Sequence, residues 1–188
     1  MSTLFILAHP NPEKSRFNKS WAQAAEELDY PVHILREHVN EEGHFNIRRE
    51  QSLLSSYQGI VISFPIQWYA PNWLLQKWLA DVLTADFAYG QAHELLDKDI
   101  TCLISTGVDE ESYSHKGALG ITIPELTSCI RLTAGFCGMK YHHPYIFYGA
   151  GKAGNDKVEQ STKTAMMHLR EFSAMQKMNN FQKEHARS

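Results

Sequence analysis

The sequence has few cysteines and no long hydrophobic run, and each absence excludes a class of protein. Its 3 cysteines, Cys102, Cys129 and Cys137, are odd in number and form no C-x-x-C pair. They indicate neither a disulfide framework nor a zinc module. We expect Cys102 and Cys137 to be buried as small hydrophobic residues. No apolar run approaches the ~20 residues that a membrane span requires.

An excess of positive charge is also missing. The 18 Lys and Arg residues against 21 Asp and Glu residues give a net charge of −3, which argues against a nucleic-acid partner because such binders are usually basic. The chain starts without the charged segment, long apolar core and cleavage site of a signal peptide. The expected location is therefore cytoplasmic. With 43% hydrophobic residues in 188, the chain suits one domain with a sizeable core.

Strand-like and helix-like segments alternate along the chain. Strands are expected at residues 3–8, 31–35, 59–64, 99–105 and 139–148. Helices, recognised by apolar residues at helical spacing, are expected at 17–28, 47–57, 71–82, 122–137 and from 156 to about 175. This alternation predicts a doubly wound, five-stranded parallel sheet with helices on both faces. We expect a single domain over residues 1–175 and a polar tail, residues 176–188, that frays from about Gln176.

Four residues indicate how individual elements begin or are interrupted. Pro71 is predicted at the first position of its helix. Thr122 and Glu125 have the spacing of a capping box. Pro144 lies inside the last strand and therefore indicates an edge or bulged strand.

The first candidate loop, residues 9–17, leads from a buried strand to a helix N-terminus. Ligands of such sheets bind beyond the carboxyl ends of the strands, and a helix N-terminus favours an anion. Ser15 and Asn18 add neutral donors, while His9 and Arg16 add charge. An ordinary capped helix, with Ser15 or Asn18 as N-cap, explains the same residues.

Two further loops, residues 64–71 and 105–121, follow strands of the same sheet. Trp68 and Tyr69 come directly after a core strand, where large flat side chains need a planar ligand, another subunit or a neighbouring loop to shield them from water. In the other loop, Gly107 allows a close backbone approach to a ligand. A simple turn at the end of the strand is the alternative interpretation.

Two further motifs are interpreted as structural. The stretch from Gly149 to Gly154 matches G-x-G-x-x-G, but only a helix is expected after it, so the second strand and acidic partner of a dinucleotide site are missing. A flexible turn is predicted there. His142 and His143 are neighbours on a strand and point to opposite faces, so we expect no metal site.

Taken together, the three loops resemble those of the flavodoxin-like NAD(P)H:quinone oxidoreductases. The resemblance rests on A-H-P-x-x-x-x-S-x-F-N at 8–18, F-P-[LI]-x-W-[YF] at 64–69, Thr106-Gly107 with Tyr113 beyond them, and C-G-[MF] at 137–139. It covers about residues 3–150 in order. The length and the motif around Glu50-Gln51 look closest to small bacterial members. These include ancillary flavoproteins of glutathione-gated potassium-efflux systems and reductases of quinones or nitro compounds.

The resemblance implies a two-electron, ping-pong hydride transfer from NADH or NADPH through bound FMN to a quinone or another planar acceptor. FMN is favoured over FAD because the chain lacks the long C-terminal extension of the animal enzymes. Tyr113 is the implied catalytic residue, because its hydroxyl can donate a hydrogen bond to charge that develops on the reduced flavin. A homodimer is also implied.

The resemblance further implies which residues bind the flavin. Those at the phosphate are His9, Ser15, Phe17 and Asn18. Those along the isoalloxazine ring are Pro65, Ile66, Gln67, Trp68 and Tyr69. Those bordering the pyrimidine side of the ring are Ser105, Thr106, Gly107 and Tyr113.

The chain departs from the family pattern at three positions. Val108 stands where a second glycine is usual, Ser105 replaces a threonine, and Leu119 replaces the histidine of the animal enzymes. A flavin-free domain with a degenerate site is one alternative. A second is a regulatory subunit of a potassium-efflux transporter, held at the inner membrane through that partner.

A one-electron, flavodoxin-type carrier is the third alternative. Its expected surface is strongly acidic, so the near-neutral charge of this chain argues against it. Trp73 and Trp78 are candidates for the dimer contact because interfaces are enriched in large aromatic residues. Core packing explains Trp78 at least as well.

Overall fold

The computed structural model describes residues 3–185, with the side chains of residues 3–178. The strands are β1 (Thr3–Leu7), β2 (Val32–Ile34), β3 (Gly59–Gln67), β4 (Ala70–Pro71), β5 (Asp99–Ser105), β6 (Lys140–Tyr141) and β7 (Tyr145–Phe147). The α-helices are α1 (Phe17–Glu26), α2 (Ile47–Ser55), α3 (Trp73–Val82), α4 (Ile123–Leu126), α5 (Ser128–Phe136) and α6 (Asn155–His185). Two short 3₁₀ helices are η1 (Pro12–Lys14) and η2 (Leu35–Glu37).

The sheet has the predicted doubly wound, parallel arrangement. Its strand order is β2-β1-β3-β5, and β5 then pairs with both β6 and β7. These pairings are parallel, whereas β4 pairs with β3 in antiparallel fashion. The strand order reverses between β1 and β3, and this is where a ligand site is expected in such a sheet.

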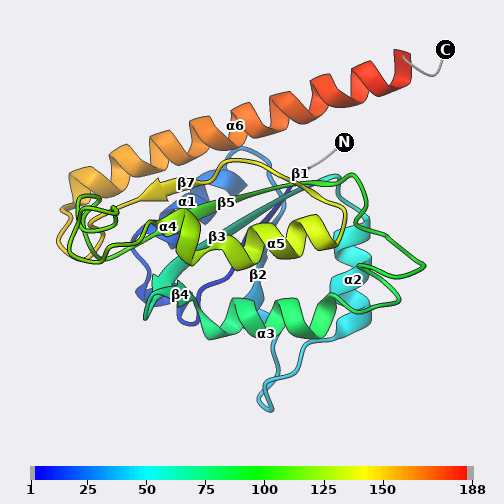
Figure 1. The fold of residues 1–188 in the computed structure, drawn as a ribbon, viewed down its shortest axis with the longest axis horizontal. Coiled ribbons are helices and arrows are strands. Elements are labelled where there is room, and N and C mark those ends of the chain that lie inside the picture. Colours follow the sequence, from blue (N-terminus) through cyan, green and yellow to red (C-terminus); the bar gives the residue numbers. More distant parts are fainter. Residues whose placement is uncertain (1–2, 186–188) are drawn as a thin grey trace.

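Helices cover both faces of the sheet, as Figure 1 shows. Helices α1 and α6 enclose one apolar core with Phe5, Leu7 and Val61. Helices α2, α3 and α5 enclose the other, with strand residues such as Ile6 and Ile62. Every residue of β1 and β5 is buried, because helices pack on both sides of these strands.

The prediction for Pro71 was wrong. Pro71 belongs to β4, and α3 begins two residues later. Asn72 is the N-cap instead, and its side chain accepts hydrogen bonds from the backbone N–H groups of Leu74 and Leu75. The same side chain donates to the Ala8 carbonyl at 2.7 Å, so this cap also connects α3 to the loop after β1.

Two predicted elements are each divided in two. The helix expected at 122–137 is interrupted at Thr127, between α4 and α5. The predicted capping box of Thr122 and Glu125 is confirmed at its start. The last strand is interrupted between β6 and β7, at the segment that contains Pro144. Proline has no N–H to donate to a ladder, and both pieces lie beyond β5 at the sheet edge.

The predicted fraying from Gln176 was also wrong as far as His185, because α6 continues to that residue. Residues 186–188 of the predicted tail lie outside the described residues. Gln176 is only 5% exposed and accepts a hydrogen bond from the Thr3 hydroxyl at 2.8 Å. A Cβ atom on Gly59 would lie 1.9 Å from the Gln176 amide nitrogen. Only glycine therefore lets α6 pack this closely on the start of β3.

The remaining predictions about burial agree with the structure. Cys102 and Cys137 are buried, and burial raises the pKa of the Cys102 thiol to about 12. Trp78 is buried in the core, whereas Trp73 is exposed, so only Trp73 is available to a partner.

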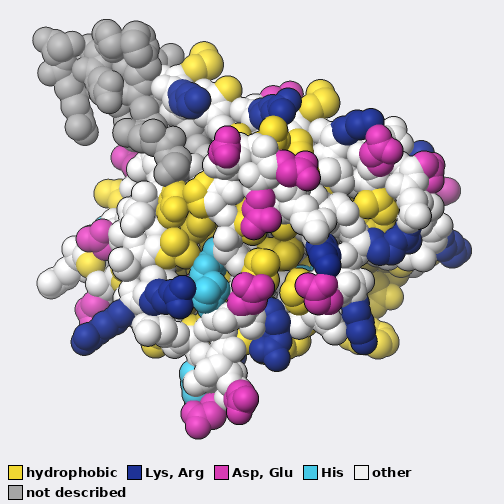
Figure 2. Space-filling view, turned by 180° about the vertical axis from the view of Figure 1, so that it is seen from behind, with side chains coloured by type: hydrophobic (Ala, Val, Ile, Leu, Met, Phe, Trp, Pro, Cys, Tyr) yellow, Lys and Arg dark blue, Asp and Glu magenta, His cyan; other side chains and the backbone are white. Residues whose placement is uncertain are grey.

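No helix within residues 3–185 combines the length and apolar character of a membrane span. Acidic and basic side chains are interspersed over the face in Figure 2.

Candidate functional site

The carboxyl ends of β1, β3 and β5 bring the three predicted loops to one edge of the sheet. Leu7 lies beside Ser63, and Pro65 lies beside Ser105. The Ala8 N–H donates to the Ser63 carbonyl at 2.8 Å. The residues expected to form one site are therefore adjacent at the ends of these strands.

Asn18 connects the first loop to the ends of β3 and β5. Its side chain is 1% exposed and donates from Nδ2 to the Ser63 hydroxyl at 3.1 Å. Its Oδ1 accepts from the Ser105 hydroxyl at 2.8 Å and from the Ser15 hydroxyl at 3.4 Å. Because its amide is engaged within the protein, the Asn18 side chain positions the loops. Its backbone N–H lies in the first turn of α1, where N–H groups have no partner within the helix.

His9 is half-buried at the start of the first loop. Its Nδ1 accepts the Asn11 backbone N–H at 3.0 Å, which leaves Nε2 as the donor of a neutral ring. Burial lowers the pKa of His9. The imidazole is therefore a neutral hydrogen-bond donor rather than a fixed positive charge.

Arg16 and Phe17 are turned away from the loop. Arg16 donates to the Ala153 carbonyl at 2.8 Å and to the Asn155 side chain at 3.0 Å, so it ties α1 to the start of α6. The Phe17 ring is buried and stacks on Phe147 with ring centroids 4.4 Å apart. Only the backbone of Phe17 is available to a ligand.

The second loop is a two-residue hairpin between β3 and β4, with Trp68 and Tyr69 at its tip. Their φ angles are +48° and +61°, the left-handed region that such turns normally fill with Asn-Gly. Trp68 is 93% exposed and Tyr69 is 49% exposed. Two large aromatic residues in strained backbone, both open to solvent, suggest a ligand-binding role, because such strain is typically concentrated at functional sites.

Relief of this strain should stabilise the protein. We expect the double variant Trp68→Asn/Tyr69→Gly to be about 1 kcal/mol more stable than Trp68→Ala/Tyr69→Ala, which loses the same rings but keeps a residue with Cβ at each positive φ. Urea unfolding of the two variants measures the difference. Equal stabilities would show that the turn is not strained.

The third loop is clamped to the segment that joins β7 to α6. Thr106 donates from its N–H to the Phe147 carbonyl at 3.0 Å, and the Val108 carbonyl accepts from the Gly149 N–H at 2.8 Å. A Cβ atom on Gly107 would meet no atom within 4 Å, whereas one on Gly151 would lie 3.1 Å from the Gly107 carbonyl oxygen. Gly107 therefore has open space on the side where a Cβ atom would lie.

Tyr113 is buried beneath the third loop. Its ring contacts that of Tyr148, with centroids 6.1 Å apart. Within residues 3–178 the Tyr113 hydroxyl has no hydrogen-bond partner. Its oxygen atom is also not completely buried. Its hydroxyl is therefore free to donate to a bound ligand.

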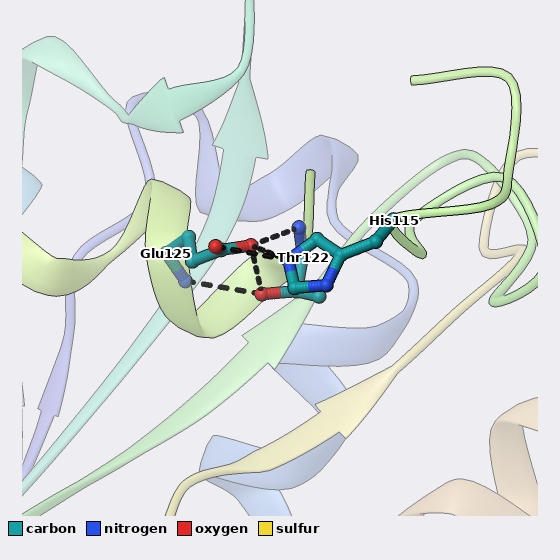
Figure 3. A network of polar contacts seen from close by, with 3 residues as sticks. All are labelled: His115, Thr122 and Glu125. Atoms are coloured by element: carbon teal, nitrogen blue, oxygen red, sulfur yellow. Dashed lines mark hydrogen bonds and ion pairs between the residues drawn. The ribbon is translucent and has the colours of Figure 1, made fainter. Parts of the chain in front are cut away.

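A polar network holds the far end of the third loop against α4 (Figure 3). His115 Nε2 lies 2.9 Å from Glu125 Oε2, which also accepts from the Thr122 N–H at 2.8 Å. Hydrogen bonds from the Thr122 hydroxyl and backbone, with a further one from His115, lower the pKa of Glu125 to about 2. Thr122 and Glu125 were predicted as a cap, but sequence reasoning did not find the contact with His115.

This network should make stability depend on pH in acid. The pKa of Glu125 is lower in the folded chain than its ordinary value of 4.5, so its stabilising contribution is full above pH 4.5 and is lost as the pH falls toward 2. We expect Glu125→Gln to be less stable than the parent at pH 6 and the difference to shrink between pH 4.5 and 3. Urea unfolding across this range checks the expectation, with Glu26→Gln controlling for one lost surface carboxylate. A difference that stays constant with pH would contradict it.

One cavity lies outside this site. It has a volume of about 660 Å³ and lies between β7, the glycine-containing turn and α6. None of the residues predicted to bind a cofactor lines it.

The turn from Gly149 to Gly154 leads directly into α6, as expected. His142 contacts Asp99, while His143 is exposed.

Comparison with known proteins gives relatives over most of the chain. The model of a family described as "Flavodoxin-like fold" matches residues 1–172. An uncharacterized NAD(P)H oxidoreductase of Bacillus subtilis is 35% identical over 174 residues, 90% of this chain and 98% of that protein. The glutathione-regulated potassium-efflux system ancillary protein KefG of Pectobacterium carotovorum is 33% identical over 162 residues, 85% of this chain and 88% of that protein.

Two solved structures are similar over nearly their whole length. General stress protein 14 of Treponema denticola, in complex with FMN, has a TM-score of 0.85 and 32% identity, covering 92% of this chain and 99% of that one. An NADPH-quinone reductase from P. pentosaceus has a TM-score of 0.78 and 26% identity, covering 89% of this chain and 97% of that one.

Proposed function

Because the chain belongs to the flavodoxin-like fold family, we propose that it is an FMN-dependent NAD(P)H:quinone oxidoreductase. Two of its relatives are named NAD(P)H oxidoreductases, a similar structure holds FMN, and another is named an NADPH-quinone reductase. The chain is an oxidoreductase, with FMN as cofactor and NAD(P)H as co-substrate. Quinones and other planar compounds, such as nitroaromatics, are the proposed acceptors.

The single observation that carries this proposal is the meeting of the three loops beyond β1, β3 and β5. One end of this region has the N-terminus of α1 and the His9 donor, which suit a phosphate. The other end has the exposed hairpin and the open space beside Gly107, which suit a flat ring system. The residues present therefore fit FMN.

The residues divide into three groups according to the part of FMN that each would hold. His9 Nε2, the Ser15 hydroxyl and the backbone N–H groups of Phe17 and Asn18 would bind the phosphate. The backbone of residues 65–69 would lie along the ring, with Trp68 against it. Ser105, Thr106, Gly107 and Tyr113 would border its pyrimidine side.

The chemistry divides between the cofactor and the protein. When bound, FMN would supply the two-electron hydride chemistry between NAD(P)H and the acceptor, in ping-pong order. The Tyr113 hydroxyl donates a hydrogen bond where negative charge accumulates. Its fixed position matters, because a preorganised donor needs no reorientation as the charge forms.

A homodimer belongs to the same proposal. Trp73 on α3 and Leu132 and Phe136 on α5 are exposed, and a groove of about 460 Å³ lies between these helices. Burial of such apolar side chains favours association. Sedimentation equilibrium of the parent and of Phe136→Ala tests this interface.

The decisive experiment is the visible spectrum of the protein after loading with excess FMN and desalting. The proposal expects a retained flavin band that bleaches when NADPH or NADH is added without oxygen and returns when a quinone is added. Failure to retain FMN would reject the site. Retention without bleaching would reject the reductase activity while keeping the binding site.

A second candidate role is that of an ancillary subunit of a potassium-efflux transporter, favoured by the identity of 33% with KefG over 162 residues. It places the protein at the membrane through its partner. Co-purification with the transporter encoded in the same organism, with FMN-loaded and FMN-free protein, tests this role. Absence of a complex in both forms would reject it.

A further inference from the structure

A cluster of imidazoles and a carboxylate lies outside the proposed flavin site. His33 on β2 and Glu50 on α2 are both buried, and His38 follows η2 and is half-buried. His33 Nε2 lies 2.8 Å from Glu50 Oε2. The rings of His33 and His38 stack with centroids 4.1 Å apart and planes 8° from parallel. One ligand atom from each of the three residues lies within 4.8 Å of the others.

A hydrogen-bond network explains only part of this cluster. Glu50 Oε2 accepts from both His33 and Trp78, each at 2.8 Å. Glu50 Oε1 is buried and has no hydrogen-bond partner in the structure. A buried polar oxygen without a partner costs free energy. The arrangement therefore leaves one carboxylate oxygen and the His38 ring without a structural explanation.

We propose that His33, His38 and Glu50 bind one divalent transition-metal ion, with Zn²⁺ as the best match to these ligands. Two imidazoles and a carboxylate are a common ligand set for Zn²⁺, which leaves a fourth position for water. The ion gives Glu50 Oε1 the partner that it lacks. It also connects β2 and the turn after η2 to α2.

The ligand atoms are assembled but not yet at coordination distance. Around tetrahedral Zn²⁺ they would lie ~3.4 Å apart, given bond lengths of ~2.1 Å. The stacked rings cannot both direct in-plane nitrogens at one point, so binding requires one ring to turn. His38 is the ring that can move, because it is half-buried in a turn, whereas His33 is held by Glu50 and by the sheet.

The surroundings of the cluster permit an ion to enter. A cavity of about 340 Å³ opens beside it and is lined by His33, Arg49, Ser52, Leu53 and Ser56. The charged groups near His38 are Arg49 and Glu37, which have opposite signs. The neighbouring charges therefore largely offset each other, and the negative charge of Glu50 remains for a cation.

The test is metal binding to the whole chain after dialysis against a chelator. Isothermal titration with Zn²⁺ is expected to give one ion per chain, and the ion should raise the melting temperature. Co²⁺ provides a second readout through its visible absorption bands. We expect His38→Ala to weaken binding at least 10-fold and to remove the Co²⁺ bands. His143→Ala, which changes an exposed histidine elsewhere, should change neither.

A second variant keeps the test decisive if His38→Ala perturbs the fold. Glu50→Gln retains an oxygen that can accept from His33 and Trp78 but removes the anionic ligand, so it should also lose Zn²⁺. Circular dichroism of both variants checks that they are folded. Stoichiometric binding that survives both substitutions, or no binding to the parent at micromolar Zn²⁺, would overturn the proposal and leave the cluster as a hydrogen-bond network. Neither outcome depends on flavin binding or activity.

Discussion

Replacement of Tyr113 by phenylalanine is expected to lower kcat about 100-fold while the protein still retains FMN. The substitution removes one hydroxyl from a buried side chain that packs on Tyr148, so the fold and the cofactor pocket should be preserved. Loss of a single preorganised donor to developing negative charge typically costs 10²–10³ in kcat. Anaerobic stopped-flow reduction with NADPH measures the effect on the first half-reaction directly.

The matched control for this variant is Tyr148→Phe. It removes a hydroxyl from the neighbouring ring without touching the residue assigned to catalysis, and turnover should stay within a few-fold of the parent. If Tyr113→Phe is as active as the parent, the hydroxyl is not the donor. If both variants lose activity equally, the two hydroxyls contribute alike and Tyr113 has no special role as the donor.

Substitution of Glu50 by alanine is expected to destabilise the fold by about 3 kcal/mol. Burial opposes ionisation of this carboxyl group, but hydrogen bonds from His33 and Trp78 more than compensate and lower the pKa of Glu50. Removal of the carboxylate leaves both buried donors without an acceptor. Removal of one partner of a buried pair lowers the free energy of unfolding by more than the intact pair contributes to it, because the other partner stays buried without a counterpart.

Glu50→Gln separates the effect of the charge from that of the hydrogen bonds. The amide oxygen can still accept from one or both donors, so we expect a smaller loss of about 1 kcal/mol. Urea unfolding at pH 7, without added metal, compares the two variants. Equal losses would show that the hydrogen bonds contribute little and that the charge is the important feature.

The sequence predicted the parts of the fold that local pattern determines. The strands β1 and β5 were found because burial on both faces of a strand produces a continuous apolar run. The helix α3 was found because burial on one face of a helix produces apolar residues at helical spacing. The neighbouring positions of the three loops followed from the parallel sheet alone. The roles assigned to individual residues at these loops rest on the family resemblance and stay predictions until the flavin-loaded protein is studied.

The errors arise from contacts between residues far apart in the chain. Gln176 has the composition of a frayed tail, yet Thr3 and Gly59 provide a place for it on the sheet. Asn72 was overlooked because Pro71 fits the start of a helix equally well. The cluster of His33, His38 and Glu50 has no recognisable ligand spacing. His33 and His38 are close in sequence, but Glu50 joins them only because α2 brings its carboxylate to His33 on β2.

The long helix α6 has a consequence for the synthesis of the protein. Ala165, Met166, Leu169 and Phe172 complete the apolar core on the α1 side of the sheet, and they are made long after the strand residues Phe5 and Leu7 that they cover. At ~5–20 residues per second, Phe5 and Leu7 emerge on the order of 10–30 s before the helix that covers them. The nascent chain therefore exposes one face of its sheet until α6 has been made. A ribosome that stalls before residue 165 holds an unfinished, aggregation-prone domain.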